Sequence, residues 1–111
     1  MKALNLSISE QISELVKHIN LATPVSSIIL FGSQVNGFPT KDSDIDLCVI
    51  TQEQDKRKLQ ILREIRKAIA SISSFPIDIL VYQEKEFAER ANLPTTLEFK
   101  IKQEGLKVYG Q

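Results

Sequence analysis

Asp44 and Asp46 stand two positions apart within an otherwise apolar run, residues 44–50, where carboxylates are costly to remove from water. In an extended strand, side chains two positions apart project from the same face, about 6 to 7 Å apart. Because their like charges repel, each carboxyl group would tend to hold a proton at neutral pH unless a cation compensates. Mg²⁺ prefers carboxylate oxygens and also accepts phosphate ligands. The pair therefore indicates metal-assisted chemistry at a phosphate.

A third acid, Asp78, interrupts the apolar segment PIDILVY, residues 76–82. If its strand neighbours the strand of Asp44 and Asp46, three carboxylates converge at one edge of a sheet. Such a cluster can hold two metal ions roughly 4 Å apart, which clamp the attacking and leaving oxygens of an in-line phosphoryl displacement. Two plainer interpretations stay open. Asp42, Asp44 and Asp46 could all face solvent at an exposed strand start, and Asp78 could be a structural hydrogen-bond partner.

Gly32 and Ser33 end the apolar run that begins at Ser27. A glycine lets the backbone approach a ligand closely, and the free N–H groups at the start of a following helix attract anions. The Ser33 hydroxyl could donate a further hydrogen bond to a terminal phosphate of a nucleotide. An ordinary turn uses the same residue types, so this pair alone does not indicate a nucleotide site.

The elements that must position these residues follow from hydrophobic periodicity. Apolar residues at helical spacing predict amphipathic helices, and β-branched runs predict buried strands. Ser7 with Glu10, and Thr95 with Glu98, have the spacing of capping boxes. In the longest helix, Leu59 is expected on the apolar face. The predicted order is helix 8–21, strand 27–31, strand 43–50, helix 55–73, strand 76–82, helix 83–92, a short helix ending near 105 and an edge strand 106–110.

This alternation predicts an α/β fold, a small mixed β-sheet with helices packed on it. With 111 residues, the chain is expected to form a single domain, residues 1–111, too short to add a separate substrate domain. Lysine plus arginine and aspartate plus glutamate each number 14, so the strongly basic balance of a dedicated nucleic-acid-binding protein is missing. Direct binding to nucleic acid is therefore not expected.

A lone cysteine, Cys48, cannot form an intrachain disulfide. No apolar segment approaches the roughly 20 residues that cross a bilayer, and the N-terminus lacks the apolar core of a signal peptide. We therefore expect a cytoplasmic protein without membrane attachment. Cys48 is interpreted as a small buried hydrophobe, and His18, the only histidine, as a surface or boundary residue rather than a ligand.

Together, FGSQVNGFPTKDSDIDLCVI and PIDILVY resemble the Gly-Ser, ten residues, Asp-x-Asp signature of the nucleotidyltransferase superfamily that includes DNA polymerase β. The chain is most similar to the minimal, MNT-type members, over nearly its whole length. The resemblance implies that Gly32 and Ser33 hold the triphosphate and that Asp44 and Asp46 bind Mg²⁺. It further implies that Asp78 completes a site for two Mg²⁺ ions and helps to activate the incoming hydroxyl.

The family also implies a substrate and a partner. The donor is usually ATP, and minimal members commonly pair with a small HEPN protein, a ribonuclease toxin, in toxin–antitoxin modules. Several such antitoxins transfer AMP to a tyrosine of the toxin. The expectation for this chain is an Mg²⁺-dependent protein adenylyltransferase that acts as an antitoxin in a hetero-oligomer with its HEPN toxin.

One departure from the family pattern keeps alternatives open. Where members often read GSRARG, this chain reads GSQVNG, so Gln34 and Asn36 replace arginines whose planar, charged groups suit phosphate. Lys41, or a basic residue of the partner, could substitute. A catalytically weak antitoxin that neutralises its toxin by binding alone is therefore the first alternative. A small-molecule nucleotidyltransferase, like those that modify aminoglycosides, is the second, although it normally needs a further domain for its acceptor.

Overall fold

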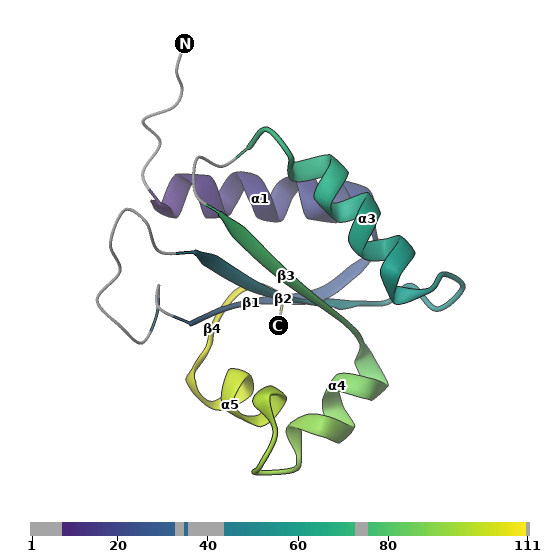
Figure 1. Ribbon diagram of the computed structural model, residues 1–111, viewed down its shortest axis with the longest axis vertical. Helices are drawn as coiled ribbons and strands as arrows, with labels where there is room; N and C mark the ends of the chain where they lie inside the picture. The colour runs from purple at the N-terminus through teal and green to yellow at the C-terminus, as the bar shows by residue number, and fades with distance from the viewer. Residues whose placement is uncertain (1–7, 33–34, 36–43, 73–75, 111) are drawn as a thin grey trace.

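The structure of the chain is a computed structural model that describes residues 8–32, 35, 44–72 and 76–110. Helices and strands alternate over these residues, in the predicted order. Their bounds are α1 Ile8–Ala22, β1 Val25–Phe31, β2 Ile45–Thr51, α3 Lys58–Ile69, β3 Ile77–Gln83, α4 Glu84–Ala91, α5 Leu97–Glu104 and β4 Leu106–Gly110 (Figure 1).

The strands form one four-stranded sheet in the order β3-β2-β1-β4. β1 pairs antiparallel with β2 and with β4, whereas β2 and β3 are parallel. A parallel pair needs a long crossover connection, and α3 lies in the connection between β2 and β3. The expected small mixed sheet is confirmed, and the terminal strand β4 lies at its edge.

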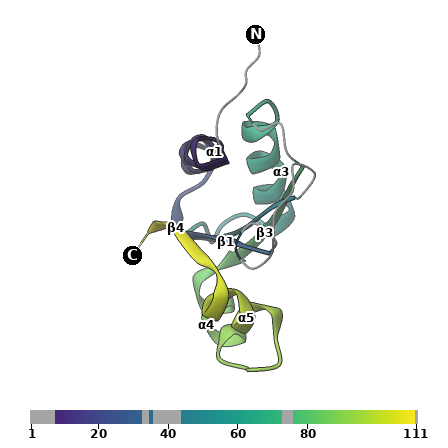
Figure 2. The same cartoon turned by 90° about the vertical axis from the view of Figure 1, so that its left-hand side faces the viewer.

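Helices cover both faces of the sheet. α1 and α3 lie on one face, and α4 and α5 lie on the other, which Figure 2 shows edge-on. Alternation along β2 serves both layers, because Leu47 and Val49 pack under α1 and α3 while Cys48 and Ile50 pack toward α4 and α5. The larger core, on the α1 and α3 side, contains Leu15, Ile19, Val25, Ile28, Leu30, Ile45, Leu47, Val49, Ile61, Ile65, Ile69, Ile79 and Val81.

Several predicted bounds shift. β1 begins at Val25, two residues earlier than predicted, and pairs there with the end of β2. α3 is shorter than the predicted 55–73 helix, and its Leu59 is 57% exposed rather than part of the apolar face. The buried residues Ile61, Ile65 and Ile69 follow a strict four-residue repeat that turns Leu59 outward.

The second capping prediction was wrong in its residue. Thr96, not Thr95, is the N-cap of α5, and its hydroxyl oxygen accepts a hydrogen bond of 3.0 Å from the backbone N–H of Phe99. The Glu98 side chain is buried and accepts a hydrogen bond from Tyr82 of the sheet. Ser7 of the first capping box lies outside the described residues. Among the residues that the structure describes, no helix is both long and apolar enough to cross a membrane.

Candidate active site

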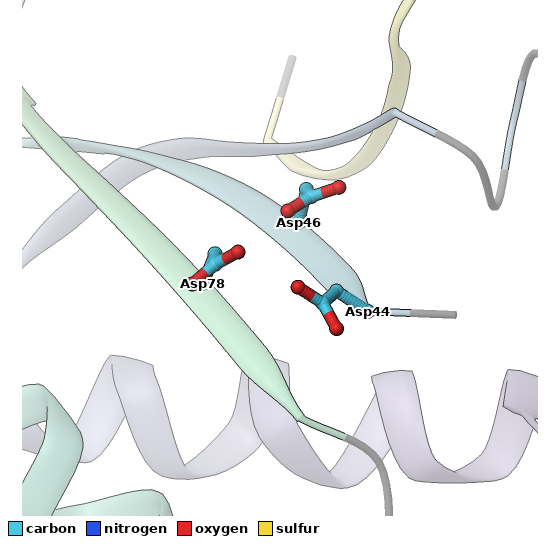
Figure 3. Close-up of side chains that lie close together, drawn as sticks. All are labelled: Asp44, Asp46 and Asp78. Atoms are coloured by element: carbon cyan, nitrogen blue, oxygen red, sulfur yellow. The ribbon is translucent and has the colours of Figure 1, made fainter. Parts of the chain in front are cut away.

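The parallel register between β2 and β3 places Asp46 directly beside Asp78. Asp44 immediately precedes β2 and, with Asp46, lies on the side of the sheet that faces α4 and α5. The three carboxylates point toward one another in Figure 3, and each offers an oxygen within 4.8 Å of the others. The predicted convergence required the strands of Asp46 and Asp78 to be neighbours, and they are.

The three acids are less buried than the apolar residues next to them in the strands. Ile45 and Leu47 are fully buried under α1 and α3, whereas Asp46, which lies between them, projects from the opposite face and is half-buried. Asp44 is half-buried and Asp78 is exposed. This placement argues against an exposed strand start with all acids directed apart into solvent. Asp44 was predicted inside the strand but lies one residue before it, and Asp42 lies outside the described residues.

The cluster carries a concentrated negative charge. The pKa of the Asp44 carboxyl is raised, first by its side-chain hydrogen bond with Asp78 and then by burial and the Asp78 charge. The pKa of Asp46 is raised chiefly by burial and then by the charges of Asp78 and Asp44. Both shifts mean that the ionised forms are disfavoured without a compensating cation.

Gly32 forms the neighbouring wall of this cluster. It follows the last residue of β1 with a φ of +83°, a left-handed conformation that side chains other than glycine rarely adopt. A Cβ atom on Gly32 would stand 3.1 Å from Asp46 Cγ and even closer to its carboxylate oxygen Oδ2. The backbone therefore lies so close to Asp46 that a side chain at position 32 would collide with it. Ser33, its predicted partner, lies outside the described residues.

The donor set fits a hard divalent cation. All three groups are carboxylates, which supply the oxygen ligands that Mg²⁺ prefers, and the oxygens are close enough to share an ion. A bound cation would also relieve the repulsion that raises the pKa values of Asp44 and Asp46. Asp44, Asp46 and Asp78 are thus the described residues able to hold such an ion.

Comparison with protein families matches residues 9–108 to the nucleotidyltransferase domain. The chain belongs to this family. The match omits only the first residue of α1 and the last two of β4 among the described elements, so it includes the acidic cluster and Gly32.

Individual relatives agree with this assignment. A 42-residue segment is 45% identical to poly(A) RNA polymerase GLD2 of Bos taurus and 43% identical to that of Homo sapiens. The segment covers 38% of the chain but only 9% of either polymerase. Among solved structures, a crystal structure of a toxin-antitoxin with AMP-PNP matches 95% of this chain and 75% of that one, with a TM-score of 0.54 and 18% identity. At that identity, the match shows that the two chains share a fold.

Two hollows lie on the α4 and α5 side of the nucleotidyltransferase domain. One, of about 490 Å³, is bordered by β1, β2, α4 and the end of α5 and reaches Ile50, four residues along β2 from Asp46. That spacing corresponds to about 13 Å, so this hollow is separate from the acids. The second, of about 230 Å³, includes Gly32 and therefore adjoins the acidic cluster.

A polar network centred on the buried Glu98 joins α4 and α5 to the sheet of the nucleotidyltransferase domain. Tyr82 donates a hydrogen bond from its hydroxyl to Glu98 Oε2, and Arg90 Nε lies 3.1 Å from Glu98 Oε1. Burial would raise the pKa of Glu98, but the Tyr82 hydrogen bond and the Arg90 charge outweigh it and hold that pKa below its ordinary value. Sequence reasoning missed this network, because Tyr82 and Glu98 are 16 positions apart.

The other singled-out side chains have structural surroundings. Cys48 is fully buried, as predicted, and burial raises the pKa of its thiol to about 12, which leaves it unreactive. His18 is partly buried, and its Nδ1 lies 2.8 Å from the backbone oxygen of Glu14, within the same helix. The residues of the family departure, Gln34 and Asn36, and the possible substitute Lys41 lie outside the described residues.

Proposed function

We propose that residues 1–111 form a single minimal nucleotidyltransferase domain that transfers AMP from ATP to a hydroxyl of a partner protein. The observation that carries this proposal is the convergence of Asp44, Asp46 and Asp78 within 4.8 Å beside a close-approaching glycine. Membership of the nucleotidyltransferase domain family supports the reaction class.

Each residue has a role in the proposed reaction. Asp44 and Asp46, with Asp78, would hold two Mg²⁺ ions, which supply positive charge to the reacting phosphate. Gly32, with Ser33, would let backbone N–H groups face the terminal phosphates. The acceptor oxygen forms a bond to the α-phosphorus of ATP, the bond from that phosphorus to the β-bridging oxygen breaks, and pyrophosphate leaves. Asp78, the exposed acid of the cluster, would accept the proton of the hydroxyl.

For the partner, we propose a HEPN-type toxin, with a tyrosine hydroxyl as the acceptor and this chain as the antitoxin of a cytoplasmic hetero-oligomer. The similarity in fold to a toxin-antitoxin structure with AMP-PNP supports ATP as the nucleotide and a toxin as the partner.

Intact mass spectrometry of the partner tests the proposal. The partner is incubated with this protein, ATP and Mg²⁺, in parallel with the Asp44→Asn, Asp46→Asn double variant. A mass gain of one or more AMP units that is absent with the variant is the expected result. A partner that gains no mass but is still silenced by the variant would instead identify an antitoxin that acts by binding alone, the outcome favoured by the GSQVNG departure.

A second candidate acceptor is the 3′-hydroxyl of RNA, because a segment of the chain resembles poly(A) RNA polymerases. The equal numbers of acidic and basic residues count against it, since a basic surface normally supplies most of the affinity for RNA. An oligoadenylate added to the same reaction separates the two acceptors. Its elongation in place of partner modification would select the RNA acceptor.

A further inference from the structure

We propose that the groove between the end of β1 and α5 binds the nucleoside part of the nucleotide, its base and ribose. This inference rests on the function proposed above. The groove has a volume of about 230 Å³ and is lined by Phe31, Gly32, Leu97, Lys100, Ile101 and Glu104. It is a place for a single ring system and its sugar rather than for a large ligand.

The groove is continuous with the acidic cluster. Gly32 belongs to the wall of the groove, and a side chain on Gly32 would collide with Asp46. A molecule in the groove therefore touches the same backbone that borders the carboxylates. Asp46 and the groove also lie on the same face of the sheet, the one covered further along by α4 and α5.

The order of the strands places Gly32 and Asp78 on opposite sides of Asp46. In the sheet order, Gly32 at the end of β1 lies on one side of Asp46, and Asp78 on β3 lies on the other. In-line transfer needs the attacking and leaving oxygens on opposite sides of the phosphorus. With Asp78 as the residue nearest the acceptor hydroxyl, the leaving pyrophosphate lies toward Gly32. The nucleoside, which stays on the α-phosphorus, then lies in the groove that begins at Gly32.

The side chains that line the groove are complementary to a nucleotide. Phe31, Leu97 and Ile101 offer apolar walls to a planar base, and Leu97 is 50% exposed. Lys100, from the next turn of α5, adds an ammonium group at the same groove. In a chain whose Gly-Ser segment lacks the family's arginines, this lysine supplies positive charge for the phosphates.

Binding measurements with the full chain test the assignment, with Mg²⁺·ATP and Mg²⁺·tripolyphosphate as the two probes in isothermal titration calorimetry. The wild-type protein is expected to bind ATP at least tenfold more tightly than tripolyphosphate, because only ATP fills the groove. Leu97→Ala should weaken ATP binding about fivefold and leave tripolyphosphate binding unchanged. Lys100→Ala should weaken the binding of both probes.

Matched controls lie close by in the chain. Leu93 is equally exposed at 54% but does not line the groove, so Leu93→Ala should leave both affinities unchanged. Lys102, two residues from Lys100 on α5, borders the other hollow, so Lys102→Ala should have little effect. The melting temperature of each variant shows whether it is folded.

The outcomes separate this inference from the function on which it rests. If wild-type protein binds neither probe, the proposed function fails. If it binds both equally, or if Leu97→Ala and Leu93→Ala behave alike, the nucleotide site stands and the groove assignment is overturned. An unchanged ATP affinity in Leu97→Ala, with a raised KM for the protein acceptor, would overturn it in favour of the acceptor as the occupant of the groove.

Discussion

The backbone of Gly32 lies against the carboxylate of Asp46, so close that a Cβ atom there would stand 3.1 Å from Asp46 Cγ. β1 and β2 bring about this approach, because Phe31 pairs with Asp46 and Gly32 follows at the strand end. The glycine at the end of β1 and the acid on β2 are thus direct neighbours.

Gly32→Ala should impair the site for two reasons. The φ of +83° is unfavourable for alanine by about 1 to 2 kcal/mol, and the new methyl group would displace the Asp46 carboxylate. We expect a stability loss of that size in chemical denaturation, together with at least a tenfold loss of Mg²⁺-dependent nucleotide binding.

Gly105→Ala is the control for Gly32→Ala. There the added methyl group would meet Ile29 and the backbone oxygen of Ile101, at the turn between α5 and β4. This variant should also lose stability, but its folded fraction should bind Mg²⁺ with unchanged affinity. Equal metal affinity in Gly32→Ala and wild type would contradict the predicted role of the close approach.

Asp46→Asn should stabilise the protein in EDTA while removing activity. The pKa of Asp46 is raised above its ordinary value of 3.8, so the folded state binds the proton more tightly than the unfolded state. Its contribution to stability is therefore greatest at low pH and falls as the pH rises from about 4 through the folded pKa, which leaves a cost at neutral pH. The melting temperature at pH 7 without metal should be higher in Asp46→Asn than in wild type.

Mg²⁺ should reverse that ranking. A ligand that binds only the folded state stabilises it by mass action, so the melting temperature of wild type should rise with Mg²⁺ concentration. Asp46→Asn should show little rise. Asp55→Asn, which changes an exposed acid outside the cluster, should respond to Mg²⁺ as wild type does. A metal response that is the same in all three proteins would contradict the assignment of Asp46 as a ligand.

Leu59→Ala and Ile61→Ala, two positions apart on α3, should differ widely in stability. Ile61 is fully buried under the sheet, and truncating such a side chain costs about 2 to 5 kcal/mol through lost contacts and a cavity. Leu59 is 57% exposed, so its truncation should change stability by less than about 0.5 kcal/mol. Urea denaturation of both variants checks the contrast, and similar losses would show that α3 is rotated relative to the structure described here.

Local patterns in the sequence account for most of the fold. The strands around Leu47 and Ile79 are apolar and β-branched because both faces are covered, and Ile61, Ile65 and Ile69 repeat at helical spacing. Such signals act over a few residues and can be recognised without tertiary information. The helix and strand order was therefore predictable, whereas the outward turn of Leu59 depended on which of several possible apolar faces meets the sheet.

The candidate site was partly predictable for the same reason. Asp44 and Asp46 are related by strand geometry alone, but their meeting with Asp78 depends on the pairing of β2 with β3 across the α3 crossover. The contact of Gly32 with Asp46 depends similarly on the register of β1 with β2. The network of Tyr82, Arg90 and Glu98 has no local signal, since each residue alone is an ordinary choice for its strand or helix.

Glu98→Gln should destabilise the attachment of α5 to the sheet. Glu98 is only 4% exposed, and its carboxylate accepts a hydrogen bond from Tyr82 and lies 3.1 Å from Arg90 Nε. Hydrogen bonds to charged groups contribute about 1.5 to 3 kcal/mol, so a stability loss in that range is expected at pH 7. Glu89→Gln, an exposed change on α4, should have no measurable effect.

The pH dependence of stability separates the charge of Glu98 from its shape. The folded-state pKa of Glu98 lies below its ordinary value of 4.5, so its contribution is complete above about pH 4.5 and is lost as the pH falls through the folded value. The stability difference between wild type and Glu98→Gln should therefore shrink in acid. Because α5 carries Leu97 and Lys100, Glu98→Gln should also weaken ATP binding, and a difference that stays constant down to pH 3 would show that the network acts through packing alone.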